Sequence, residues 1–98
     1  MNKKFILLQV SSDTDEKTST QLNTWIIDTF DNPYEATNRM NNFIKQRFSE
    51  LMDLDGVMDI AFRRCYRVFA FSCCQINFNF KNTQSIEYYA VMELKEKE

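Results

Sequence analysis

The segment from Asn32 to Gly56 carries the local signals of one long helix. Asn32 is a residue type that caps helices with its side chain, and Pro33 suits the first helical position because the N–H it lacks would have no partner there. Glu35 stands where a capping-box acid reaches back to the cap. Gly56 follows at the place where a left-handed residue commonly ends a helix. These signals predict a helix over about residues 33–54.

Apolar residues recur along this segment at three- and four-residue spacing, which places them on one side of a helix. They are Ala36, Met40, Phe43, Ile44, Phe48, Leu51 and Met52. The opposite side carries Asn38, Asn41, Lys45 and Gln46, with Arg39 and Glu50 near its borders. Such a helix is amphipathic, and we expect it to lie on one face of a β-sheet.

Two segments before the helix have strand character. Lys3 to Val10 contains an unbroken apolar run, which is typical of a central strand. Leu22 to Phe30 is rich in β-favouring residues and predicts a second strand, antiparallel to the first. The intervening residues 11–20 are polar throughout and predict a mobile loop.

Two more strands are expected after the helix. Residues 74–80 alternate strictly between apolar and polar types, and alternation resumes from Ile86 to Leu94, which predicts a hairpin around a turn at 81–85. The segment 57–62 fits either a short strand or a helical turn. Residues 95–98 are expected to be a frayed tail.

The resulting order is β-β-α-β-β. An additional short strand directly after the helix is an alternative that the sequence does not decide. This order predicts a two-layer α+β fold, in which one long helix covers one face of a mostly antiparallel sheet. A chain of 98 residues has the usual size of a single domain, here 1–98, and its 44% hydrophobic residues are enough for one core.

The apolar segments are too short for a membrane helix, and the run from Phe5 to Val10 is too short for the core of a signal peptide. We therefore expect a cytoplasmic protein without a membrane partner. The three cysteines are an odd number, so a disulfide framework is not expected. Cys73 and Cys74 are adjacent and would point to opposite faces of a strand as small buried side chains, while Cys65 is interpreted as an incidental thiol.

The chain contains no histidine, which removes imidazole acid–base catalysis and the Cys-His and Ser-His nucleophile pairs. Its single glycine excludes a phosphate-binding P-loop and a dinucleotide fingerprint. We therefore expect no enzymatic activity, no catalytic residue and no cofactor. Acidic residues cluster at 13–16 and 53–59, but neither cluster matches a calcium-binding loop, so no metal site is predicted.

The leading hypothesis is a small non-enzymatic protein-binding module that acts by occupying a surface of a partner. An inhibitor of a host defence enzyme, encoded by a phage or another mobile element, is the narrower form of this hypothesis and rests on analogy of type. The alternative is an oligomeric protein that binds or sequesters a small ligand or nucleotide through Arg63, Arg64, Tyr66 and Arg67. The net charge of −2 does not favour nucleic acid as a partner.

The predicted binding surface is the face of the sheet that the helix leaves uncovered. If Tyr88, Ala90 and Met92 face the core, the residues of opposite parity face outward. The predicted partner-binding residues are Trp25, Ile27, Phe69, Phe71, Tyr89 and Val91. We expect this surface to be covered by another protein or by a second copy of the chain in a homo-oligomer.

Overall fold

The computed structural model describes residues 4–14, 21–64, 71–81 and 83–94. Its elements are β1 (Lys4–Thr14), β2 (Gln21–Phe30), α1 (Pro33–Asp53), β3 (Val57–Arg64), β4 (Ser72–Phe80) and β5 (Thr83–Leu94). The strands form one five-stranded sheet in the order β2-β1-β5-β4-β3, and every neighbouring pair is antiparallel. The predicted two-layer α+β architecture is confirmed, and the segment after the helix is a strand.

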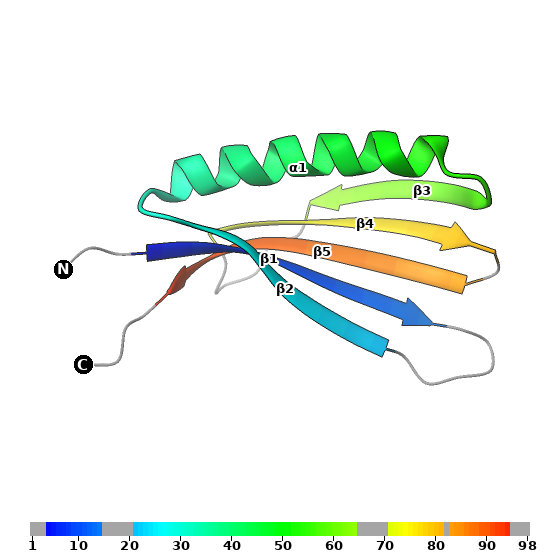
Figure 1. The fold of residues 1–98 in the computed structure, drawn as a ribbon, viewed down its shortest axis with the longest axis horizontal. Helices are drawn as coiled ribbons and strands as arrows, with labels where there is room; N and C mark the ends of the chain where they lie inside the picture. Colours follow the sequence, from blue (N-terminus) through cyan, green and yellow to red (C-terminus); the bar gives the residue numbers. More distant parts are fainter. Residues whose placement is uncertain (1–3, 15–20, 65–70, 82, 95–98) are drawn as a thin grey trace.

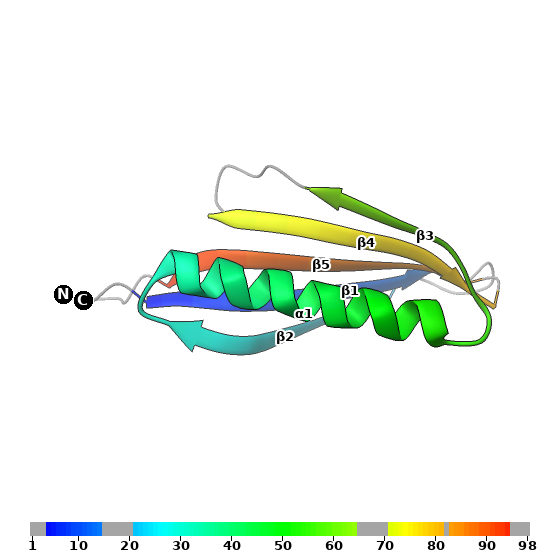
Figure 2. The same cartoon turned by 90° about the horizontal axis from the view of Figure 1, so that it is seen from above.

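Helix α1 connects the two edge strands of the sheet, β2 and β3, and therefore passes over its middle (Figure 1). Seen from above, it runs along the length of the strands (Figure 2). The core lies between this helix and the sheet face beneath it. In the part of the chain that the structure describes, no second helix lies over the other face, which we call the open face.

Both predicted helix ends are confirmed. The Oδ1 atom of Asn32 accepts a hydrogen bond of 2.7 Å from the backbone N–H of Tyr34, so the cap satisfies a donor that has no partner within the helix. Pro33 begins the helix. Gly56 has a φ of 88°, the left-handed conformation that lets the chain leave the helix and enter β3.

The helix buries the predicted stripe with one exception. Ala36, Met40, Ile44 and Leu51 are buried, while Phe43 and Phe48 are half-buried. Met52 was predicted to face the sheet, but 67% of it is exposed. It follows the buried Leu51 in the last turn, and a step of about 100° per residue carries it off the stripe.

The predicted loop at 11–20 was wrong for its first part, because β1 continues to Thr14. Residues of this extension pair with β2 on one side and β5 on the other, for example Ser11 with Asn23 and Glu87. Two neighbouring strands thus supply the backbone hydrogen bonds that hold a polar segment in the sheet. The predicted turn at 81–85 is shorter, since β5 begins at Thr83. Residues 15–20 and the predicted tail at 95–98 lie outside the described residues.

Candidate functional site

The side chains of β5 alternate between the helix side of the sheet and the open face. Tyr89 and Val91 are fully buried and belong to the core beneath α1, together with Leu7 and Ile76. The alternation of a strand then places Tyr88 and its same-parity neighbours on the open face. The predicted orientation of β5 was therefore wrong: Tyr89 and Val91 are core residues beneath the helix and do not lie on the open face.

The other predicted partner-binding residues also do not form one outward surface. Trp25 is 51% exposed but lies on the helix side, at the rim of an open recess beside α1. Ile27 packs against the core. Phe71 contacts the rings of Phe5 and Tyr34, with centroids 6.4 and 5.4 Å away. The predicted Phe69 lies outside the described residues.

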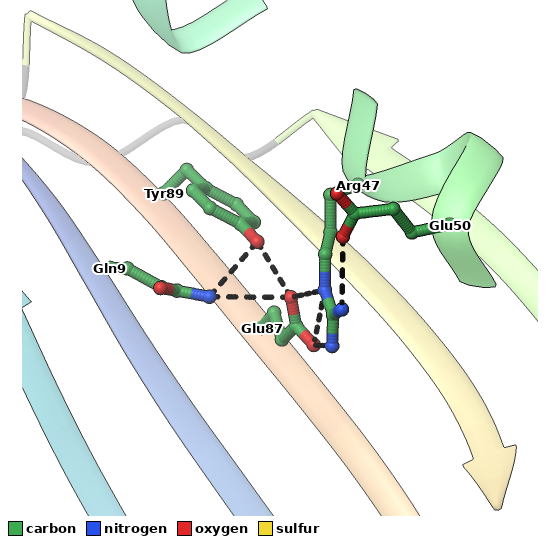
Figure 3. A network of polar contacts seen from close by, with 5 residues as sticks. All are labelled: Gln9, Arg47, Glu50, Glu87 and Tyr89. Carbon is green, nitrogen blue, oxygen red and sulfur yellow. Dashed lines mark hydrogen bonds and ion pairs between the residues drawn. The ribbon is translucent and has the colours of Figure 1, made fainter. Parts of the chain in front are cut away.

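A polar network lies between α1 and the sheet (Figure 3). Arg47 of α1 donates from Nε to Oε1 of Glu87 at 2.9 Å and from Nη2 to Oε2 at 2.7 Å. The Tyr89 hydroxyl donates to Oε1 of Glu87 at 2.6 Å, and the Gln9 amide donates to the Tyr89 oxygen at 3.0 Å. Glu50 accepts a longer contact of 3.5 Å from Arg47. The Glu87 carboxylate, only 5% exposed, is thus compensated by a cation and by neutral donors.

The electrostatics of this network favour charged Arg47 and neutral Tyr89. The hydrogen bond to Glu87 raises the pKa of Arg47, and it outweighs the opposing effect of burial. Burial raises the pKa of Tyr89, and its hydrogen bond to Glu87 acts in the same direction. Among the described residues, no buried side-chain nitrogen or oxygen lacks a partner. This closed arrangement holds α1 on the sheet and orients β5.

Arg47 and Glu87 were missed by the sequence predictions, although both had a signal. Arg47 lies three residues after Ile44 and four before Leu51, so it stands on the apolar stripe of the helix. Glu87 is a charged residue in the interior of an otherwise uncharged strand segment. A basic residue on the apolar stripe of a helix, together with an acidic residue inside a strand, indicates a buried ion pair between the helix and the sheet.

The open face carries a continuous set of uncharged apolar side chains, which we call the apolar strip. Its members are Ile6, Leu8 and Val10 of β1, Ile26 of β2, and Ile86, Tyr88, Ala90 and Met92 of β5. The strand register makes them neighbours, since Leu8 lies beside Ile26 on one side and Ala90 on the other. Ile26 is 63% exposed, and the others are half-buried.

A row of amides on β4, the amide row, borders the apolar strip. It consists of Gln75, Asn77 and Asn79, which share the open face by alternation. The Gln75 amide donates to Oδ1 of Asn77 at 2.6 Å, and the Asn79 amide donates to Asp59 at 3.2 Å. The open face is therefore apolar over β1 and β5 and at Ile26 of β2, and hydrogen-bonding over β4.

The remaining candidate residues are only partly described. Arg63 lies exposed on the edge strand β3, whereas the Arg64 side chain, Cys65, Tyr66 and Arg67 lie outside what the structure describes. The ligand site predicted there therefore lies mostly outside the described residues and stays a prediction. Cys73 and Cys74 are both buried, and only Cys74 belongs to the core cluster beneath α1, in line with their opposite orientations.

No group of three metal-ligating side chains occurs among the described residues. Within the same residues, no helix is both long and apolar enough to cross a membrane. No protein-family model, curated protein or solved structure matches the chain.

Proposed function

We propose that this chain is a non-enzymatic protein-binding module that docks a partner on the open face of its sheet. The observation that supports the proposal is the apolar strip, which spans three adjacent strands and carries no charge. The helix that covers the core lies on the other side of the sheet (Figure 1). The largest contiguous apolar patch on the surface of a protein is often a functional interaction site.

The chemistry of the open face favours a partner with an apolar surface and a polar border. Contact would remove the exposed parts of Ile26 and its half-buried neighbours from water, at about 25 cal/mol per Å² of apolar area. The amide row offers donors and acceptors beside this area, as in interfaces with an apolar centre and a hydrogen-bonding rim.

The backbone of the open face is held in place by the antiparallel pairing of five strands and by α1 behind them. A surface organised before binding loses little conformational entropy on docking, which suits a protein that acts by covering a surface of its partner. An inhibitor or adaptor works in this way. Inhibition of a host defence enzyme by a phage-encoded protein remains the narrower form of the proposal.

Site-directed photo-crosslinking in the cells that make the protein tests the proposal. The photoreactive amino acid p-benzoylphenylalanine replaces Ile26 in the apolar strip or, as a control, Met52 at the end of α1. The two side chains are similarly exposed, at 63% and 67%. We expect a discrete covalent adduct with another polypeptide from position 26 and none from position 52. The proposal is wrong if neither position gives an adduct, or if both give the same one.

A further inference from the structure

We infer that the partner on the open face is a second copy of this chain, in a symmetric dimer that packs sheet against sheet. The inference rests on the proposed use of the open face and adds the identity of its occupant. In a dimer with a two-fold axis, one surface patch contacts the same patch of the other copy. The open face must therefore be complementary to itself.

The distribution of charge meets this requirement. Because the apolar strip carries no charge, two copies of it meet without like charges in contact. The charged residues of the open face lie toward its border: Lys4 is paired with Asp31 at 3.1 Å, and Asp59 and Arg63 are on the edge strand β3. The whole chain has a net charge of only −2, so long-range repulsion between two copies is weak.

The arrangement of the strip and the row also fits a two-fold axis. An axis that lies between the two sheets and runs across the strands places each strand over its own copy. The apolar strip then packs on the apolar strip, and the amide row lies on the amide row. Each amide is both a donor and an acceptor, so where the axis passes between Gln75 and Asn77, the Gln75 of one copy can bond to the Asn77 of the other.

The size of the open face matches what such a dimer needs. Five strands spaced about 4.8 Å apart, each about ten residues long with a rise of about 3.3 Å, cover roughly 800 Å². A stable protein interface of standard size takes about 800 Å² from each partner. One open face is therefore of the right order of size for one partner of this kind, with the apolar strip as the dry part of the interface.

Sedimentation velocity of the purified chain, from about 1 to 100 μM, tests the inference. We expect a species of twice the 11.7 kDa chain mass. Ile26→Lys should weaken the dimer at least tenfold because it places a charge in the apolar strip, whereas Met52→Lys should not. Tyr88→Lys is a second strip variant, used once circular dichroism shows that it folds, and it should have the same effect as Ile26→Lys.

The inference is overturned if the wild-type chain is a monomer throughout this range, or if Ile26→Lys and Met52→Lys affect the dimer equally. Failure of the inference is distinguishable from failure of the proposed function. If the chain is a monomer but still crosslinks from position 26 to a different polypeptide, the inferred dimer is wrong and the proposed docking face is supported. A monomeric chain without any adduct overturns both.

Discussion

Arg47 of α1 and Glu87 of β5 meet as a two-point ion pair, with the Arg47 Nη2 atom 2.7 Å and its Nε atom 2.9 Å from the two carboxylate oxygens. This pair holds Glu87 on the buried side of β5, where Tyr89 also donates to it. Residues of the opposite parity, among them Tyr88 and Met92, consequently lie on the open face. The ion pair thus determines which set of β5 side chains is available to a partner.

Removing the cation of this pair should be more costly than removing both charges. Arg47→Met leaves the Glu87 carboxylate buried without its cation, and we expect a loss of about 3 kcal/mol in the free energy of unfolding. The double variant Arg47→Met/Glu87→Gln keeps an acceptor for Tyr89 and should regain at least half of that loss. Urea denaturation measures both variants and the single variant Glu87→Gln. Simply additive losses from the two substitutions would contradict the account.

The buried Tyr89 hydroxyl should make the stability depend on pH in the alkaline range. Its folded pKa lies above the ordinary value of 10.0. The contribution of the protonated hydroxyl is therefore fully present below pH 10 and is lost as the pH rises toward the folded pKa. Above pH 10 the unfolded state ionises first, so the free energy of unfolding falls by up to about 1.4 kcal/mol per pH unit.

Comparison with Tyr89→Phe isolates this effect, because all other titrating groups are shared by the two proteins. The stability advantage of wild type over Tyr89→Phe should shrink between pH 9 and pH 11 in urea denaturation experiments. An advantage that stays constant over this range would show that Tyr89 ionises equally in the folded and unfolded states.

The cap of α1 should contribute measurably to stability. Asn32→Ala removes the acceptor of the Tyr34 N–H, and we expect a loss of about 1 kcal/mol. Asn32→Asp retains a capping oxygen and should lose much less. Thermal denaturation followed by circular dichroism compares the two, and equal losses would rule out the capping role.

The helix stripe can be tested with one buried and one exposed position. Ile44→Ala removes a buried side chain between α1 and the sheet and should cost about 2–5 kcal/mol in the free energy of unfolding. Met52→Ala removes an exposed one and should change stability by less than about 0.5 kcal/mol. Similar urea midpoints for the two variants would contradict the assigned orientation of the helix.

The helix was predictable from sequence because its signals are local: a capping residue, a proline at the first position and an apolar stripe. The orientation of β5 was not, because both of its faces contain apolar residues. Ile86, Tyr88, Ala90 and Met92 form an unbroken apolar set, while the truly buried set includes Ser85 and Glu87. Alternation alone favours the wrong set.

The buried position of Glu87 depends on Arg47, a residue forty positions away in the sequence. Only the packing of α1 on the sheet brings the two together, so the cost of burying the acid cannot be judged from β5 by itself. The open face was correctly expected to be uncovered by the helix, but its residues could be named only after this long-range contact was known.

Methionine oxidation tests most directly whether the open face is covered by a protein. Met92 belongs to the apolar strip and is half-buried in the isolated chain, Met52 is 67% exposed on α1, and Met40 is 3% exposed in the core. Mass spectrometry measures the oxidation rate of each residue in cells and in dilute purified protein. We expect Met92 to oxidise in cells almost as slowly as Met40 and to regain an intermediate rate on dilution, while Met52 stays fast in both. A Met92 rate that is the same in cells and at high dilution would contradict the proposed docking face.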